Sequence, residues 1–272
     1  MLGRILITGS HGQLGTELSK LLPDAILTGK EDLDITDFSA VRKFVKAHGI
    51  EIIVNCAAYT AVDKAENECL LAEKINALGP ENLAKTGCKI VHISTDYVFD
   101  GKHCQPYTPD DVTNPLSVYG RTKRAGELAV LNNAKEAVVI RTAWLYSSCG
   151  NNFVKTMKRL GGERENINVV FDQIGTPTYA GDLAEAIVKI LPLVCEKTKG
   201  IYHFTNEGVC SWYDFAVEIM KKSGLHCQVN PISSSSYPTK AIRPFYSVLD
   251  KSKIKNTFGV KIAHWREAFE RS

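Results

Sequence analysis

The stretch that decides the fold is Ile5-Leu6-Ile7-Thr8-Gly9-Ser10-His11-Gly12-Gln13-Leu14-Gly15. A short apolar run, rich in β-branched residues, leads into glycines with the spacing G-x-x-G-x-x-G, and a helical pattern follows over 13–22. A strand that feeds a glycine turn and then a helix predicts a pyrophosphate site, because backbone N–H groups and the helix dipole attract anions. A plain glycine-rich connector is the alternative at this point.

Each glycine has its own predicted role in this turn. Gly9 permits the tight turn, Gly12 lets a ligand approach the backbone, and Gly15 lets the helix pack closely on the strand. The residues between the glycines share the same turn and therefore the same ligand. We expect a dinucleotide to be held by Gly9, Ser10, His11, Gly12, Gln13, Leu14 and Gly15.

The composition is that of an ordinary globular chain. Its 272 residues suit one large α/β domain with a smaller appendage. The formal charge of +3, without a basic block, gives no reason to expect nucleic acid as a partner. No apolar run approaches the length of a membrane span, and no signal peptide is recognisable. The eight cysteines show neither C-x-x-C pairs nor zinc spacing, so we expect reduced thiols, a cytoplasmic protein and no metal.

Alternating strand and helix patterns up to residue 146 predict a parallel sheet with right-handed crossovers. Strands are expected at 4–8, 25–28, 50–56, 89–94 and 137–142. Helices are expected at 13–22, 38–48, 68–86 and 118–131, the third of them broken or bent near Gly79-Pro80. This pattern is typical of a Rossmann-type, doubly wound α/β fold, with a dinucleotide-binding domain over residues 1–146.

The composition changes after Tyr146. We expect residues 147–272 to form mainly a smaller α/β substrate-binding region, with some segments returning to the first sheet. Asp182 and Ser211 are natural helix caps, and the serines at 233–236 predict a loop. Further helices are expected at 151–160, 182–191, 212–223, 253–258 and 265–270, and strands at 168–171 and 200–205.

The end of the second predicted strand bears on the choice of cofactor. An acidic residue at this place holds the adenosine ribose hydroxyls in folds that prefer NAD. Here the sequence reads Thr28-Gly29-Lys30, and the lysine can meet a 2′-phosphate instead. The sequence therefore favours NADPH, with NADH as the other candidate, while a solvated loop lysine is the alternative interpretation of Lys30.

The strongest chemical set is Thr95, Tyr119 and Lys123. Tyr119 and Lys123 lie one turn apart on one face of a predicted helix, downstream of the strand that ends near Thr95. A tyrosine can give a ketone oxygen its proton, and a nearby ammonium stabilises the phenolate and lowers the tyrosine pKa. The lysine can also bind a nicotinamide ribose, and Thr95, or less favourably Ser94, can hold the carbonyl oxygen. Alone, the Y-x-x-x-K spacing also arises as an incidental surface pair.

These motifs resemble those of the extended short-chain dehydrogenases/reductases and, within that superfamily, the dTDP-4-dehydrorhamnose reductase family. The resemblance covers nearly the whole chain and is carried by 5–15, 54–66, 94–101, 114–123, 141–144, 150–153, 172–178 and 243–250. It implies NAD(P)H-dependent reduction of the C4 ketone of dTDP-4-dehydro-β-L-rhamnose to dTDP-β-L-rhamnose. It also implies a place in nucleotide-sugar and cell-surface polysaccharide biosynthesis and leaves a homodimer open.

The resemblance assigns roles at the catalytic and cofactor positions. Tyr119 would be the catalytic acid, Lys123 its partner on the cofactor ribose, and Thr95 the residue that binds the keto oxygen and tunes the tyrosine. The adenine and the rest of the dinucleotide would lie against Asp34, Ile35, Ala57, Ala58 and Tyr59.

The resemblance also implies contacts with the substrate. Asp96 would contact the sugar, and Trp144 would pack against its deoxy face, although Trp144 judged alone is as consistent with the core. Gln173 and Arg243 would contact the nucleotide diphosphate, since an arginine fork suits phosphate.

Two alternatives to this function remain at the level of the sequence. One is an NADP-binding regulatory subunit of a methionine adenosyltransferase, and the other is a reductase of a different nucleotide-linked keto-sugar. Some members of the family dimerise around a metal held by carboxylates. Glu17 matches one of these positions, but Gly181, with Asp182 beside it, stands at another, so we expect no metal.

Overall fold

The centre of the fold is a six-stranded parallel sheet, seen in a computed structural model that describes residues 3–272. The strands lie in the order β10-β5-β4-β3-β1-β2, and every neighbouring pair is parallel. Their bounds are β1 Ile5–Thr8, β2 Ile26–Thr28, β3 Ile52–Asn55, β4 Lys89–Thr95, β5 Ala137–Thr142 and β10 Gly200–His203. Because β2 and β3 lie on opposite sides of β1, this is the doubly wound arrangement, and the predicted Rossmann-type fold is confirmed.

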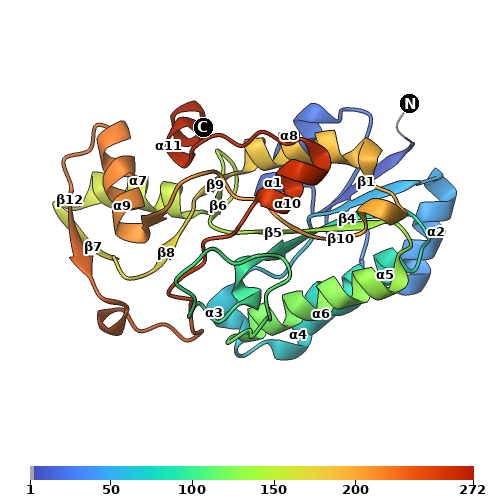
Figure 1. The fold of residues 1–272 in the computed structure, drawn as a ribbon, viewed down its shortest axis with the longest axis horizontal. Coiled ribbons are helices and arrows are strands. Elements are labelled where there is room, and N and C mark those ends of the chain that lie inside the picture. The colour runs from blue at the N-terminus through green and yellow to red at the C-terminus, as the bar shows by residue number, and fades with distance from the viewer. Residues whose placement is uncertain (1–2) are drawn as a thin grey trace.

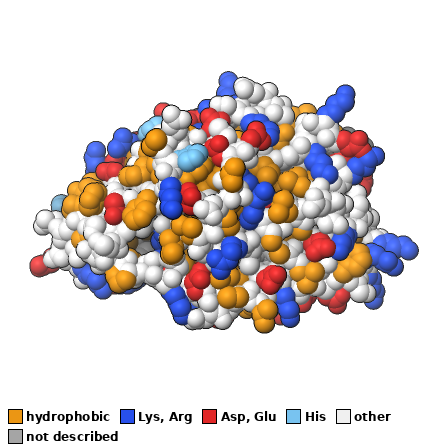
Figure 2. Space-filling model, turned by 60° about the horizontal axis from the view of Figure 1, so that its bottom comes forward, with side chains coloured by type: hydrophobic (Ala, Val, Ile, Leu, Met, Phe, Trp, Pro, Cys, Tyr) orange, Lys and Arg blue, Asp and Glu red, His pale blue; other side chains and the backbone are white. Residues whose placement is uncertain are grey.

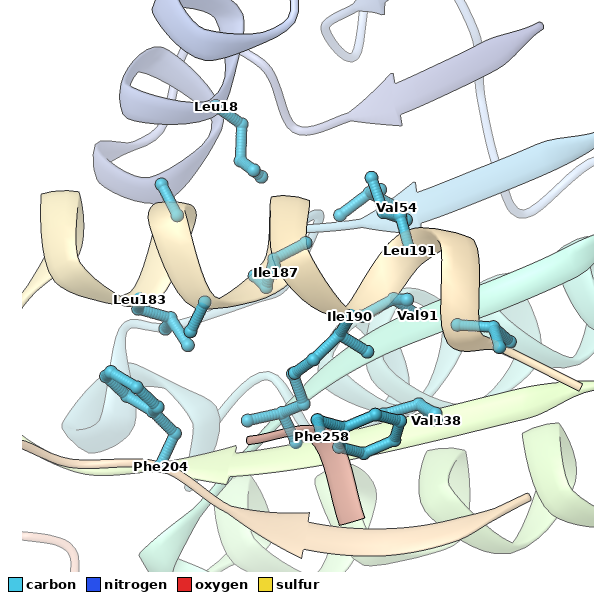
Figure 3. Packing of buried hydrophobic residues seen from close by; sticks show 14 of the residues in the cluster. Leu18, Val54, Val91, Val138, Leu183, Ile187, Ile190, Leu191, Phe204 and Phe258 are labelled. Carbon is cyan, nitrogen blue, oxygen red and sulfur yellow. The ribbon is translucent and has the colours of Figure 1, made fainter. Parts of the chain in front are cut away.

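Helices cover both faces of the sheet (Figure 1). On one face, α1 (Gln13–Leu21), α8 (Ala180–Ile190) and α10 (Ser252–Phe258) share a core cluster with alternate strand residues. Figure 3 shows part of this cluster, where Ile190 of α8 lies close to Val91 of β4. A second cluster fills the opposite face, beneath α2 (Phe38–His48), α5 (Gly79–Ala84) and α6 (Val118–Asn133).

The burial of the strands explains their composition. All four residues of β1 and all six of β5 are buried, as expected for parallel strands covered on both faces. The one charged residue among them is Arg141 of β5, which forms an ion pair with Glu127 of α6 at 2.8 Å. A polar pair inside an otherwise apolar layer is costly unless its hydrogen bonds are satisfied. This buried ion pair therefore fixes the position of α6 against β5.

The second half of the chain forms a smaller α/β region. It also contributes β10 to the central sheet and α8 and α10 to the helices that cover one face of that sheet. Its core cluster includes Met157, Phe215, Ile219 and Trp265. The longer elements are α7 (Phe153–Glu163), α9 (Trp212–Lys222), α11 (Trp265–Arg271), and the parallel strands β7 (Asn166–Val170) and β12 (Gln228–Ile232). Two-residue strands make up the pairs β6 (Leu145–Tyr146) with β9 (Thr178–Tyr179) and β8 (Ile174–Gly175) with β11 (Cys210–Ser211).

The structure corrects two expectations about helices. The helix predicted over 68–86 is not broken at Gly79-Pro80. It runs through α4 (Cys69–Glu73), a π-helical turn over Lys74–Leu78, and α5, after the separate short helix α3 (Val62–Ala65). Pro80 lies inside this continuous run, shortly after the π-helical turn, where it has no backbone N–H to donate to the preceding turn.

The second correction concerns Asp182. Helix α8 begins at Ala180 after Tyr179, so Asp182 lies inside the first turn and is not the cap. Its carboxylate instead accepts hydrogen bonds from Asn206 and Arg271. Ser211 does cap α9, through a reciprocal pair of hydrogen bonds with Asp214, as predicted. The serine loop at 233–236 contains a single 3-10 turn over Ser234–Ser236.

Helix α6 approaches the π-helical turn very closely at Gly126. A Cβ added at Gly126 would lie 2.1 Å from the backbone oxygen of Asn76. The Asn76 side chain is itself buried and donates a hydrogen bond to Thr122 of α6 at 3.1 Å. Only glycine permits this packing, which sets the distance of α6 from the layer that flanks the cleft.

Replacing this glycine should therefore destabilise the protein. We expect Gly126→Ala to lower the free energy of unfolding by about 1–3 kcal/mol, since overpacking forces the backbone apart. The control is Gly162→Ala in α7, where an added Cβ meets nothing within 4 Å. That change should be neutral or stabilising by up to about 1 kcal/mol. Urea unfolding of both variants is the measurement, and equal effects would contradict the close approach at Gly126.

Candidate active site

A cleft of about 810 Å³ lies at the carboxyl ends of the central strands. It spans the point beside β1 where the strand order reverses, which is where doubly wound sheets bind ligands. The structure brings most of the predicted site residues to this one cleft. They are Gly9, Gly12, Gln13, Leu14, Gly15, Lys30, Asp34, Ile35, Ala57, Ala58, Thr95, Asp96, Tyr119, Lys123 and Trp144.

The glycine turn forms one wall of the cleft. Gly9 has φ +65, and a Cβ there would lie 2.6 Å from the backbone nitrogen of Ala57. Gly12 is the N-cap of α1, which has no side-chain cap and no acidic residue in its first turn. The amide groups of that turn thus retain their attraction for an anion. This cradle fits the pyrophosphate of a dinucleotide, as predicted from the spacing.

The loop after β3 lies directly beside the glycine turn and lines the cleft next to it. Asn55 accepts a hydrogen bond from the backbone N–H of Ala57 at 3.1 Å, which fixes the start of the loop. Asn76 then brackets the backbone of Tyr59, accepting from its N–H at 2.8 Å and donating to its carbonyl at 3.1 Å. The Tyr59 hydroxyl donates to Glu68 at 2.6 Å, so its ring does not line the cleft, whereas Ala57 and Ala58 do.

The far end of the cleft is basic. Lys30 lines it, together with Lys74, a residue that the sequence motifs did not single out because it lies on the unpredicted π-helical turn. Both lysines act on Asp34, whose pKa is held below its usual range mainly by hydrogen bonds from Thr36 and further by the two ammonium groups. Two amines around one carboxylate leave net positive charge at this end of the cleft.

Two other predicted cofactor residues lie at the margin of the cleft. Ser10 is buried and its hydroxyl has no hydrogen-bond partner among the described residues. The His11 ring is close to Gly29, where an added Cβ would lie 2.8 Å from it. Neither side chain lines the cleft itself.

The catalytic set lies at the other end of the cleft. Thr95 ends β4, while Tyr119 and Lys123 project from the first turns of α6. The Lys123 ammonium donates to the backbone oxygen of Ile93 at 2.6 Å. Ser94, the weaker candidate for holding a carbonyl, donates its hydroxyl proton to Glu127 at 2.6 Å. Ser94 is thereby committed to Glu127, whereas the Thr95 hydroxyl lines the cleft in a hydrogen bond to Asp96 at 3.0 Å.

Burial controls the acid–base properties of this corner. It raises the pKa of Tyr119 to about 12, with Thr95 opposing the shift through a hydrogen bond, and it lowers the pKa of Lys123 to about 8. This contradicts the expectation that the lysine holds the tyrosine pKa below its usual value. The reason is that desolvation of the phenolate outweighs other influences, while the ammonium is directed at Ile93. Tyr119 thus keeps its proton at neutral pH.

Asp96 is a second buried acid beside the tyrosine. Burial raises the pKa of its carboxyl to about 7, and a hydrogen bond from Thr95 opposes the shift. The Thr95 hydroxyl donates to Oδ1 at 3.0 Å, whereas Oδ2 has no partner among the described residues. An unpaired carboxylate oxygen on a cleft-lining residue is an acceptor for a polar ligand group.

Trp144 is held in an unusual backbone conformation. Its φ is 50, a strained value for a bulky residue, and strain of this kind persists where the surroundings impose it, often at binding sites. Its ring stacks on Trp212 of α9 with centroids 3.6 Å apart. Trp212 belongs to a predicted helix but was not predicted as part of the site, since sequence spacing gives no sign of this stack.

Gln173 and Arg243 lie away from the cleft lining. The Gln173 amide donates to Ser234 at 3.0 Å. The Arg243 guanidinium pairs with both carboxylate oxygens of Asp63, at 2.6 Å and 3.2 Å. The pair fastens the segment around Arg243 to α3 beside the cleft.

Other features of the described residues bear on partners. Glu17 is buried and pairs with Lys20 at 2.7 Å, and no group of three or more potential metal ligands occurs within 3–272. None of the helices in this range combines the length and apolar character that crossing a membrane requires. All eight cysteines lie in the described part and none is bonded to another. Figure 2 shows Lys and Arg side chains interspersed with acidic and hydrophobic ones over the face in view.

Comparison with known proteins identifies the family. The family model described as the RmlD substrate binding domain matches residues 3–272. A solved dTDP-4-dehydrorhamnose reductase from Clostridium acetobutylicum is 46% identical, with a TM-score of 0.95, covering 98% of this chain and 97% of that chain. One from Bacillus anthracis, solved in complex with NADP, is 42% identical with a TM-score of 0.94, covering 100% and 98%.

A third relative has a related but different substrate in its name. It is a probable dTDP-4,6-dihydroxy-2-methyloxan-3-one 4-ketoreductase from Streptomyces antibioticus, 43% identical over 97% of this chain and 92% of its own length. The matches extend over both the dinucleotide-binding half and the smaller α/β region. The chain therefore belongs to the RmlD family, the family of the dTDP-4-dehydrorhamnose reductases.

Proposed function

We propose that this protein reduces the C4 ketone of dTDP-4-dehydro-β-L-rhamnose to dTDP-β-L-rhamnose with NADPH, in nucleotide-sugar and cell-surface polysaccharide biosynthesis. The observation that carries this is the meeting of Thr95, Tyr119 and Lys123 in the same cleft as the glycine cradle. A cofactor cradle alone indicates a dinucleotide, whereas a protonated tyrosine beside a lysine indicates carbonyl reduction. The substrate named for the solved relatives supports the choice of sugar.

The cofactor would lie along the carboxyl edge of the sheet. The first turn of α1 would hold the pyrophosphate, the loop at Ala57 and Ala58 would flank it, and Lys123 would reach the nicotinamide ribose. Lys30 lines the basic end, where the 2′-phosphate of NADPH would neutralise it. When bound, the reduced nicotinamide supplies the hydride that the carbonyl carbon needs.

The chain's own residues supply the proton and the orientation. The hydroxyls of Thr95 and Tyr119 would hold the ketone oxygen, and Tyr119 would transfer its proton to that oxygen as the carbon is reduced. Charge develops on the phenol oxygen as the proton leaves, and the Lys123 ammonium stabilises it. The tyrosine then regains a proton from solvent, so each turnover consumes one hydride and one proton.

The substrate sugar would lie between the two halves of the chain. The Trp144–Trp212 stack offers a flat apolar wall that suits a 6-methyl group, and the free oxygen of Asp96 suits a sugar hydroxyl. Gln173 and Arg243 remain proposed contacts for the diphosphate, with Arg243 approaching from the segment that Asp63 fastens. The free thiols are consistent with the cytoplasm as the place of reaction.

A reductase of another dTDP-linked keto-sugar is the second candidate, favoured by the 43% identity to the Streptomyces antibioticus ketoreductase. It would use the same cofactor and proton donor, and would differ in the wall that meets the sugar. The regulatory-subunit alternative gains no support from these relatives, which are named as reductases. Turnover of the two sugars side by side separates the two reductase candidates.

The role of Tyr119 can be tested by removing only its hydroxyl. We expect Tyr119→Phe to lower kcat about 10²–10⁴-fold, because loss of a general acid costs that much. Affinity for NADPH should stay within about twofold, since the variant keeps the cradle. The measurements are NADPH oxidation with dTDP-4-dehydrorhamnose and a fluorescence titration with NADPH. A variant that turns over at the wild-type rate would remove Tyr119 from the mechanism.

The role of Lys30 can be tested by comparing the two cofactors. We expect Lys30→Ala to weaken NADPH about tenfold or more and to leave NADH nearly unchanged, because a charge-assisted hydrogen bond contributes about 1.5–3 kcal/mol. The control is Lys43→Ala, an exposed lysine on α2 outside the cleft. Calorimetric titration of both cofactors gives the affinities, and an equal loss for NADPH and NADH would contradict the assignment.

A further inference from the structure

Glu127 is a buried acid on the helix that carries Tyr119 and Lys123. Its side chain is 0% exposed, and both of its carboxylate oxygens accept hydrogen bonds. Oε1 accepts from Ser94 Oγ at 2.6 Å and from Arg141 Nε at 2.8 Å. Oε2 accepts from Arg141 Nη2 at 2.8 Å and from Arg124 Nη1 at 2.9 Å. A carboxylate with two partners on each oxygen is fixed in place.

These contacts tie together the segments that carry the chemistry. Ser94 immediately precedes Thr95 at the end of β4, and Arg141 lies on β5 just ahead of the turn that leads to Trp144. Glu127 itself is rigidly connected to Tyr119 and Lys123 through α6. One side chain therefore sets the position of the hydroxyl of Thr95 relative to the phenol of Tyr119.

Glu127 also lies one turn from Lys123, at i+4 on the same face of α6, so its carboxylate acts on the charge of that lysine. The titratable groups that act on this lysine come from three elements. They are the carboxylate of Glu127 on α6, the thiol of Cys56 after β3, and the imidazole of His92 on β4. His92 is kept neutral by burial, which holds its pKa well below the usual range, and burial raises the pKa of the Cys56 thiol to about 12. Among these groups Glu127 alone forms ion pairs, with Arg141 at 2.8 Å and Arg124 at 2.9 Å, so it is the group that faces Lys123 as an opposite charge.

We propose that Glu127 is a positioning residue for the reduction, which places Thr95 and Tyr119 together and keeps Lys123 in its ammonium form. The kinetic consequences rest on the proposed function, whereas the effect on Lys123 is a property of the chain alone. Stability of the core alone does not require this carboxylate, because apolar groups often replace a buried ion pair at no loss of stability.

The charge effect can be measured directly on Lys123. Removing Glu127 alone would leave the buried Arg141 without its ion-pair partner, so the variant of choice is the double substitution Glu127→Gln with Arg141→Gln. In protein labelled with ¹³C at the lysine ε-carbon, the Lys123 signal is assigned by its loss in Lys123→Arg and followed against pH. We expect its titration midpoint to fall by about 0.5–1 pH unit, because loss of an opposite charge disfavours the charged form and Glu127, unlike Arg141, is among the groups that act on Lys123.

The control is Arg159→Gln with Glu163→Gln, which removes the same two charges from an exposed ion pair on α7 and should leave the midpoint unchanged. A folded double variant whose Lys123 midpoint equals that of the wild type would overturn the charge effect. The pH dependence of kcat/KM should shift in the same direction as the Lys123 midpoint. Activity needs charged Lys123, so it is present below the pKa and lost above it, and a lower pKa moves the alkaline limb of kcat/KM to lower pH.

The positioning effect is tested with a separate variant. This variant also tests the proposal if the double variant does not fold. Glu127→Asp keeps both charges but shortens the tether by one methylene. We expect kcat to fall on the order of tenfold at unchanged KM, because small misplacements of catalytic groups cost rate, with the Lys123 midpoint near that of the wild type. A wild-type kcat in this variant would overturn the positioning role. Absence of turnover in the wild-type protein would instead count against the proposed function and leave the Lys123 titration decisive.

Discussion

The ion pair between Glu127 and Arg141 lies buried between α6 and β5, and the geometry of the cleft depends on it. Helix α6 carries Tyr119 and Lys123, and β4 carries Thr95. The carboxylate of Glu127, itself on α6, accepts hydrogen bonds from Ser94 on β4 and from Arg141 on β5. Breaking such a pair from one side costs about 3–5 kcal/mol, a large part of the usual stability of a domain. The catalytic corner is therefore as fixed as the core beneath it.

Burial of this corner determines how its groups can act. The pKa of Tyr119 is raised to about 12 and that of Asp96 to about 7, in both cases mainly by loss of solvent. The tyrosine is thus protonated at neutral pH, which suits an acid that must protonate a ketone oxygen. At the opposite end of the cleft Lys30 and Lys74 give a positive field. The two ends differ in charge and in chemistry, and this difference orients a dinucleotide along the sheet edge.

The fold and the meeting of Thr95, Tyr119 and Lys123 in one cleft could be predicted from sequence because they follow local patterns. The apolar strands and the glycine turn predicted the sheet, and the spacing of Tyr119 and Lys123 placed both on one helix. The π-helical turn with Lys74, the cap of α8 and the Trp144–Trp212 stack could not be predicted, since they depend on contacts between distant segments. The expected lowering of the Tyr119 pKa was wrong for the same reason, because a sequence does not reveal how deeply a helix face is buried.

In the proposed reaction, a hydride reaches C4 of the sugar while Tyr119 protonates the oxygen. This reaction is tested most directly by turnover with NADPH that carries two deuterium atoms at C4 of the nicotinamide ring. We expect one deuterium at C4 of the rhamnosyl group of dTDP-β-L-rhamnose, detected by NMR of the isolated product. Product without deuterium at this carbon, or with deuterium at another carbon of the sugar, would contradict it.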